Sequence, residues 1–153
     1  MAVEIERKFL VTGNAWKQGT ATHFSQGYLN RDKNRTVRIR LAGNQAFITI
    51  KGISAGISRA EFEYEIPADD AVALLKLCDD PVIQKIRYVI IHNGFKWEVD
   101  EFLGENLGLV VAEIELSSED QSFERPSWVG KEVTDDARYF NSNLASLPYS
   151  KWL

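Results

Sequence analysis

Charged side chains at every second position of successive segments constrain the fold of this chain more than any other feature. Residues 3–11, VEIERKFLV, place Glu4, Glu6 and Lys8 on alternate positions. Because neighbouring side chains of a β-strand point to opposite faces, these charges share one face at intervals of about 6.5 to 7 Å. Two carboxylates this close are unfavourable unless water surrounds them or a bound group lies between them.

The same alternation continues along the chain and predicts eight strands. Most connections are short enough for hairpins, and the Gly43-Asn44 turn is typical of one. We therefore predict one antiparallel sheet, which eight strands are enough to close into a barrel. The predicted strands are residues 3–11, 22–30, 36–41, 46–52, 59–66, 82–91, 95–102 and 109–116.

Two segments change to a helical period. Residues 68–78 have apolar side chains at positions i, i+3, i+4 and i+7 and acids in the first turn, which predicts a helix. Residues 117–130 show no period and are predicted to be irregular. A second helix is expected over 135–147, with Thr134 as its N-cap. Its predicted apolar stripe is Ala137, Phe140, Leu144 and Leu147.

Same-sign charges recur in pairs on one face of the predicted strands. An unrelated β-domain with a solvated outer face is one interpretation, but such a surface would more often alternate the two signs. Pairs of one sign are favoured where each pair binds an opposite charge: acids bind divalent cations, and Arg or Lys binds phosphate oxygens. Facing inward, they would form a tunnel suited to metal-bound polyphosphate. The pairs are Glu4/Glu6, Arg38/Arg40, Glu61/Glu63, Lys85/Arg87, Glu98/Asp100 and Glu113/Glu115.

Composition limits the remaining classes of function. The 153 residues are 44% hydrophobic and 26% charged, which is typical of one globular domain. The net charge of −4 argues against a nucleic-acid partner. The single cysteine, Cys78, excludes an internal disulfide and favours a cytoplasmic location. We expect neither a secretory signal nor a membrane span, because no apolar run approaches about 20 residues.

The ordered motifs resemble those of the triphosphate tunnel metalloenzymes, also called the CYTH domain family. EIERK at 4–8 has that family's E-x-E-x-K signature, and RIR, TIK, EFEYE, KIR, WEVDEF and EIEL follow in order. The segment GKEVTDDARYFNSN also resembles the C-terminal part of short bacterial members. The resemblance implies one domain over residues 1–153. Its fold would be mainly β (α+β): an eight-stranded antiparallel closed β-barrel tunnel with a few flanking helices and a C-terminal helix.

The resemblance also assigns roles to the charged residues. The implied phosphate-binding bases are Lys8, Arg38, Arg40, Lys51, Lys85 and Arg87, with Arg59 as either a further ligand or a rim charge. The implied metal-binding acids are Glu4, Glu6, Glu61, Glu63, Asp100, Glu113 and Glu115, and the metal is Mg²⁺ or Mn²⁺. The implied catalytic residues are Lys85, Glu63 and Lys8, and Lys85 would position the attacking water.

The activity implied by the resemblance is metal-dependent hydrolysis of inorganic tripolyphosphate to pyrophosphate and phosphate. Other family activities stay open, namely a class IV-type adenylate cyclase or a nucleoside or thiamine triphosphatase, because fold alone does not select a reaction. A different class of function is a non-catalytic binder of polyphosphate or nucleotide. The expected partner is therefore a small molecule that contains triphosphate, and a homodimer is a further hypothesis from the family.

Overall fold

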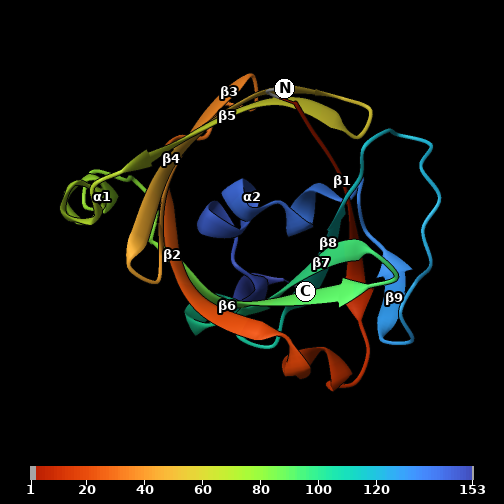
Figure 1. Cartoon of the computed structure of the whole chain (residues 1–153). Helices are drawn as coiled ribbons and strands as arrows, with labels where there is room; N and C mark the ends of the chain where they lie inside the picture. Colours follow the sequence, from red (N-terminus) through yellow and green to blue (C-terminus); the bar gives the residue numbers. More distant parts are fainter. Residues whose placement is uncertain (1–2, 153) are drawn as a thin grey trace.

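The structure, a computed structural model, describes residues 3–152 and is a closed antiparallel barrel (Figure 1). Neighbouring strands follow the order β5-β4-β3-β2-β6-β7-β8-β1-β9, and a further β5–β1 pairing closes the ring. This confirms the predicted eight-stranded closed barrel. The strands are β1 (Val3–Val11), β2 (Thr20–Asn30), β3 (Arg35–Ala42), β4 (Gln45–Ala55), β5 (Ser58–Ile66), β6 (Ile83–His92), β7 (Phe95–Phe102), β8 (Val110–Glu115) and β9 (Val129–Glu132).

Strand β1 closes the barrel by pairing with different partners along its length. Its first residues pair with β5, from Val3 opposite Ala60 to Ile5 opposite Ser58. Its last residues pair with β9, with Phe9 opposite Glu132. Strand β9 lies partly within the segment predicted to be irregular, and its four residues are too few to show a period.

Tight turns set the register of the hairpins. Ala42 pairs with Gln45 across the predicted Gly43-Asn44 turn, and Gly43 has φ +62°. His92 pairs with Phe95 across Asn93 and Gly94, whose φ values of +50° and +80° fit a type I′ turn. Since a shift of one residue would exchange the two faces of a strand, these turns help to keep the charged side chains on the inner face.

The apolar core lies largely outside the barrel wall. On the outer face of β1, β7 and β8, Phe9, Trp97 and Ile114 are buried, and Phe123 and Trp128 from the long 117–128 connection cover them. On the outer face of β3 and β4, a second cluster packs beneath helix α1 (Ala68–Leu75). Because many apolar side chains are buried on the outer face of the wall, much of the inner face can carry charged side chains.

Helix α1 is shorter than predicted, since it ends at Leu75 rather than Cys78. The predicted helix over 135–147 is wrong in extent. Residues Ala137–Tyr139 form a 3-10 turn, Phe140 is extended, and α2 covers only Asn141–Ser146. Instead of capping a helix, the Thr134 hydroxyl accepts a hydrogen bond from the backbone of Lys8 on β1, at 3.0 Å. That tertiary contact competes with the local signal that predicted an N-cap.

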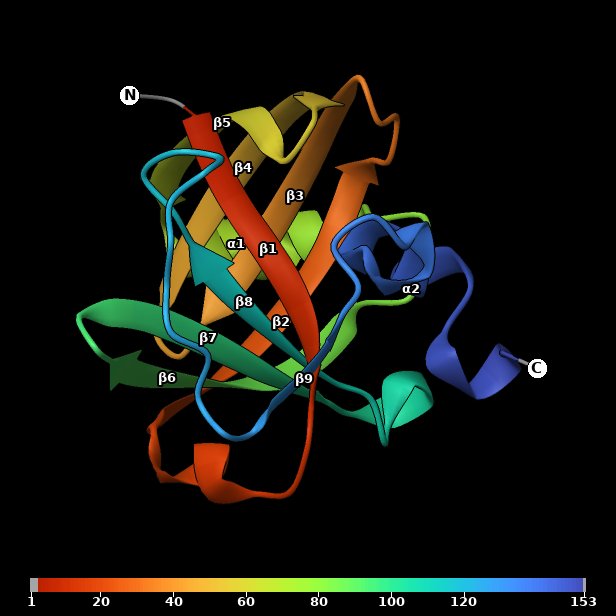
Figure 2. The ribbon, with the colours of Figure 1, turned by 90° about the vertical axis from the view of Figure 1, so that its right-hand side faces the viewer.

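The segment around α2 lies within the ring of strands and closes one end of the barrel (Figures 1 and 2). Tyr139, Leu144 and Ala145 pack in one buried cluster with wall residues that include Phe102 and Ile83. Of the predicted apolar stripe, Leu144 is buried in this cluster, but Ala137 and Leu147 are exposed.

Short 3-10 turns occupy Ala15–Gln18, Gly104–Asn106 and Tyr149–Lys151. Within residues 3–152, no helix has both the length and the apolar character that a membrane span requires.

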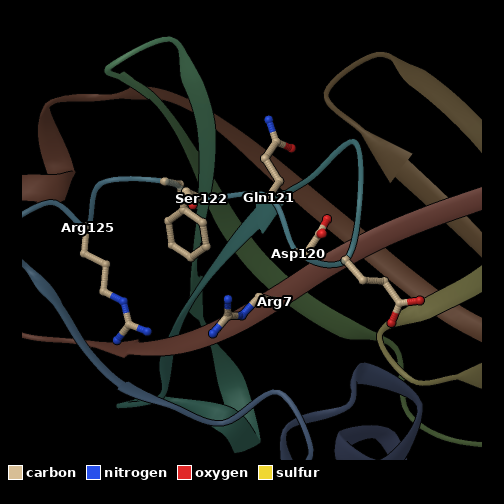
Figure 3. Close-up of a pocket in the computed structure, with 7 residues that line it drawn as sticks. Arg7, Asp120, Gln121, Ser122 and Arg125 are labelled. Carbon is tan, nitrogen blue, oxygen red and sulfur yellow. The ribbon is translucent and has the colours of Figure 1, made fainter.

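An ion pair outside the barrel ties β1 to β9. The guanidinium of Arg7 donates to both carboxylate oxygens of Glu132 at 2.8 and 2.5 Å, and Arg125 lies 3.8 Å from the same carboxylate. Arg7 and Arg125 also line a cavity of about 300 Å³ beside the 117–128 connection (Figure 3). Glu132 pairs with both arginines, Glu119 and Asp120 also line this cavity, and the cavity lies outside the tunnel.

We expect Glu132→Gln to lower the free energy of unfolding by about 1 to 2 kcal/mol at neutral pH. The hydrogen bonds from Arg7, together with one from Thr134, hold the pKa of Glu132 below its ordinary value. The stabilisation is therefore present above the usual carboxylate range and is lost as the pH falls through the folded-state value. Urea unfolding of both proteins should show a gap at pH 7 that narrows in acid. Glu124→Gln, at a largely exposed carboxylate, is the control; an equal loss in both variants would contradict this account.

Candidate active site

The antiparallel register brings opposite charges together on the inner wall. Lys8 on β1 is opposite Glu113 on β8, and its ammonium lies 3.7 Å from that carboxylate. Arg87 on β6 is opposite Asp100 on β7, and Lys51 on β4 is opposite Glu61 on β5. Alternate side chains thus meet across the two strands of a hairpin, and, for Lys8 and Glu113, across strands from opposite ends of the chain. Basic and acidic groups contact one another along the inner wall.

A cluster of cations surrounds Asp100 near the closed end of the tunnel. The Asp100 carboxylate is 2% exposed and accepts hydrogen bonds from Arg87 Nε and Nη2 at 2.7 and 2.8 Å. The fully buried Lys85 ammonium lies 2.8 Å from Asp100 Oδ2. On its other side, Arg87 Nη1 reaches Glu98 at 3.2 Å. Both oxygens of Asp100 therefore contact cations of the protein. The family resemblance implies that Asp100 is a metal-binding acid, and metal binding by Asp100 stays a prediction.

The ring of Phe24, on β2, lies among the same cations. The Arg40 and Arg87 guanidinium carbons are 4.7 and 4.8 Å from the ring centre, and Lys85 Nζ is 5.8 Å from it. Cations are attracted to an aromatic face at these distances, so the ring helps to hold like charges close together. Phe24 was not among the predicted site residues. Phe24, Gln26 and Tyr28 occupy alternate positions of the same strand, and this spacing is the signal that indicates an inner position for Phe24.

The electrostatics of this cluster favour an anion. Burial, reinforced by Arg87 and Arg40, lowers the pKa of Lys85 to about 7 even though Asp100 opposes the shift. Burial and the neighbouring Arg38 and Arg87 lower the pKa of Arg40 to about 9. Burial alone would raise the pKa of Asp100, but Arg87 and Lys85 hold it well below the ordinary value. The charges of Lys85 and Arg40 are thus insufficiently compensated within the protein, whereas Asp100 and Glu98 raise the pKa of Arg87. A bound polyanion would stabilise the charged forms of Lys85 and Arg40.

Arg38 extends the basic wall towards β4 and β5. Its Nη2 donates to Thr49 Oγ1 at 3.1 Å, and Thr49 in turn contacts Glu63 at 2.9 Å. In the part of the chain that the structure describes, Arg38 Nε is buried without a hydrogen-bond partner. Buried donors are rarely left unpaired, so this N–H is available to a ligand oxygen in the tunnel. Arg59 instead donates to Gly52 O at 2.7 Å and to Thr36.

The predicted metal-binding acids form a second region of the inner wall. Burial and the nearby Glu113 and Glu4 raise the pKa of Glu6 well above its usual value. Burial, with the charge of Glu4, likewise raises the pKa of Glu61 to about 7. Lys51 partly neutralises this region, since its ammonium lies 2.7 Å from Glu4 and 3.5 Å from Glu61. These carboxylates repel one another strongly enough that a cation between them would be stabilising.

The acids fit a divalent cation by their chemistry, although their side chains are not gathered as a complete ligand set. Among residues 3–152, no group of three or more His, Cys, Asp or Glu side chains is arranged to hold a metal ion. Mg²⁺ commonly takes one or two carboxylates and completes its shell with water and substrate phosphate oxygens. The mutually repelling Glu4, Glu6, Glu61 and Glu113 meet that lesser requirement. Glu115, opposite Glu6 in the register, is exposed at the strand end.

Two amides complete the network near α2. Asn141 Oδ1 accepts hydrogen bonds from Lys85 Nζ at 2.9 Å and from Gln26 Nε2 at 2.8 Å, and Gln26 Oε1 accepts from Arg40 Nε at 3.0 Å. Neither amide was among the predicted site residues. Gln26 has the spacing of an inward-facing strand residue, whereas no sequence signal places Asn141 beside Lys85.

The fold and the site define a class of protein, namely a closed barrel whose inner wall carries buried cations beside a group of repelling carboxylates. Such a wall suits an anionic ligand. Within this class, the chain belongs to the CYTH domain family, whose model matches residues 2–146. The resemblance of its motifs to that family is thereby confirmed.

Two relatives and one similar solved structure are named inorganic triphosphatase. An inorganic triphosphatase of Acetivibrio thermocellus is 51% identical over 99% of both chains. An inorganic triphosphatase of Nitrosomonas europaea is 37% identical over 95% of this chain and 99% of that protein. Among solved structures, the inorganic triphosphatase NE1496 superposes with a TM-score of 0.68 at 35% identity, covering 95% of each chain. The present chain thus matches these relatives over nearly their whole length.

Proposed function

We propose that this protein is an inorganic triphosphatase that hydrolyses tripolyphosphate to pyrophosphate and phosphate in its tunnel. The observation that carries the proposal is the cluster of the buried Lys85 and Arg87 with the half-buried Arg40, which lies beside the carboxylates of the inner wall. The names of the relatives support the choice of substrate, because the chain matches them over nearly its full length.

The basic residues bind the phosphate chain along its length. Arg40, Lys85 and Arg87 take the end nearest α2, whereas Arg38, with its unpaired Nε, takes oxygens nearer to β4 and β5. Lys8 and Lys51 lie next to the acids and bridge the two regions. Arg59, held by Gly52 O and Thr36, is a ligand towards the β4–β5 side. These donors also neutralise negative charge that develops as the phosphoanhydride bond breaks.

A divalent cation, Mg²⁺ or Mn²⁺, would be held by Glu4, Glu6, Glu61 and Glu113, with Glu63 and Glu115 in outer positions. When bound, such an ion neutralises phosphate oxygens and lowers the pKa of a coordinated water. Hydrolysis requires water to attack one end phosphorus in line with the departing pyrophosphate. In this proposal, Lys85 donates to the reacting phosphate or its attacking water, Lys8 holds the neighbouring phosphate, and Glu63 orients water through its contact with Thr49.

We expect kcat/KM for tripolyphosphate to exceed that for ATP by about 10²-fold or more, with pyrophosphate accumulating as product. Inorganic triphosphate can use every basic contact of the tunnel, whereas a nucleoside occupies length without offering these bases a partner. Pyrophosphate is too short to reach the cation cluster and the acids together. Phosphate release should be measured with tripolyphosphate, ATP, GTP, thiamine triphosphate and pyrophosphate, each with Mg²⁺ and with Mn²⁺.

The same screen separates the alternative functions. Better turnover of ATP, or consumption of pyrophosphate as fast as tripolyphosphate, would contradict the substrate assignment. Formation of cyclic AMP from ATP would indicate an adenylate cyclase. Tight binding of tripolyphosphate without any phosphate release, with either metal, would indicate a non-catalytic binder. The cytoplasmic location, the homodimer and a single domain over residues 1–153 stay predictions.

A further inference from the structure

We propose that Asn141, at the start of α2, is a positioning residue that aims the Lys85 ammonium into the tunnel. This inference deepens the proposed triphosphatase function and rests on it. It gives the C-terminal segment that closes the barrel, residues 137–146 (here called the plug), a role in the site in addition to closing one end of the barrel. The observation is the pair of hydrogen bonds that meet on Asn141 Oδ1, from Lys85 Nζ at 2.9 Å and from Gln26 Nε2 at 2.8 Å.

The direction of each hydrogen bond in this network follows from chemistry. The Lys85 ammonium and the Arg40 guanidinium can only donate, so Asn141 turns its oxygen to Lys85 and Gln26 turns its oxygen to Arg40. The Gln26 amide nitrogen then donates to Asn141 Oδ1, which fixes the orientation of both amides. Gln26 and Lys85 are fully buried, so neither can readily exchange these partners for water. The chain from Arg40 through Gln26 and Asn141 to Lys85 is therefore one connected unit.

The geometry leaves Lys85 one donor for a ligand. An ammonium has three N–H groups in a fixed tetrahedral arrangement. Within residues 3–152, its polar contacts are Asp100 Oδ2 at 2.8 Å and Asn141 Oδ1 at 2.9 Å. Two acceptors held on different elements, β7 and α2, determine where the third N–H points. With Asp100 alone, the ammonium could rotate about that single contact.

Packing holds Asn141 in place. Leu144 and Ala145, one turn further along α2, are buried in the cluster that closes the barrel. The preceding residue, Phe140, contacts Lys8: the Lys8 ammonium nitrogen lies 5.3 Å from the centre of the Phe140 ring. Adjacent residues of the plug thus contact two of the tunnel bases. A rigid element that presents an acceptor to a buried lysine is suited to positioning, because small displacements of a catalytic group cost much of its effect.

The test compares Asn141→Leu with Asn141→Asp in the full-length protein. Leucine is similar in size but cannot accept a hydrogen bond, so kcat for tripolyphosphate should fall about tenfold or more while KM changes less than about threefold. Aspartate keeps an acceptor for Lys85 and Gln26, so kcat should largely recover. Its added negative charge next to the cation cluster should raise KM. Melting temperatures of both variants report whether the plug is still folded.

Asn143→Leu is the matched control. Asn143 is on the same helix and donates to Ala137 O at 2.8 Å, within the C-terminal segment itself. Its loss should leave kcat and KM within about twofold of the wild type. The inference is overturned if Asn141→Leu keeps wild-type kcat, if Asn143→Leu lowers kcat equally, or if Asn141→Asp fails to recover it. A wild-type protein without triphosphatase turnover would remove the proposed function and this inference together, whereas an active wild type with unaffected variants removes the inference alone.

Discussion

Replacing Asp100 by alanine is expected to cost about 3 to 5 kcal/mol of the free energy of unfolding. The carboxylate is 2% exposed and compensates the buried Arg87 and Lys85 through contacts of 2.7 to 2.8 Å. Without it, Lys85 would lose its carboxylate partner, and Arg87 would keep only the contact with Glu98 at 3.2 Å. Urea unfolding of the metal-free protein at neutral pH measures the loss.

Two further variants determine whether the uncompensated charge is the cause. Glu98→Ala removes a contact with Arg87 at 3.2 Å from a more exposed carboxylate, so its cost should stay below about 1 kcal/mol. Lys85→Met in the Asp100→Ala background removes one orphaned cation and should recover part of the stability. Added tripolyphosphate should also stabilise Asp100→Ala, since an anion that binds the folded state shifts the equilibrium. Equal losses in Asp100→Ala and Glu98→Ala would show that Asp100 has no special role.

The second large effect concerns activity. Glu6→Gln should reduce metal-dependent turnover of tripolyphosphate by about 10²-fold or more, because the proposed cation site loses a ligand. The metal-free protein should hold or gain stability, because the pKa of Glu6 is raised by burial, Glu113 and Glu4. An acid with a raised folded-state pKa destabilises the protein increasingly as the pH rises through that value. The contribution of Glu6 to the stability of the metal-free protein should therefore fall from acid to neutral pH. The free energy of unfolding of Glu6→Gln, relative to that of the wild type, should rise over the same range.

Glu4 and Glu65 supply the comparisons for Glu6. Sequence pattern alone predicts that Glu4→Gln would also keep or raise metal-free stability. The structure changes that expectation, because Glu4 is paired with Lys51 at 2.7 Å and its loss removes an attractive contact. Glu65, an exposed carboxylate on β5, is the control, and Glu65→Gln should leave turnover unchanged. Near-normal turnover of Glu6→Gln at limiting metal would mean that Glu6 is not a metal ligand.

Much of the fold could be predicted from the sequence because β-structure of this kind is encoded locally. Alternation at spacing two identified the eight barrel strands, and the glycine-containing turns at 43–44 and 93–94 fixed two hairpins. The failures lie where local signals are short or are overridden. Strand β9 has only four residues, and the last helix is interrupted because Thr134 bonds to β1 and Phe140 is extended.

By itself, the sequence determined which residues share a face. It therefore also determined that pairs of acids, or pairs of bases, would lie on one side of a strand. It could not determine which groups become neighbours across strands that are far apart in the chain, because this depends on closure of the barrel. Only the tertiary structure placed Lys8 beside Glu113 and turned Gln26 towards Asn141. Only packing of the C-terminal segment inside the barrel brought an asparagine from α2 to a lysine 56 positions earlier. Alternation is a property of single strands, whereas the strength and direction of buried charge contacts are properties of the closed barrel.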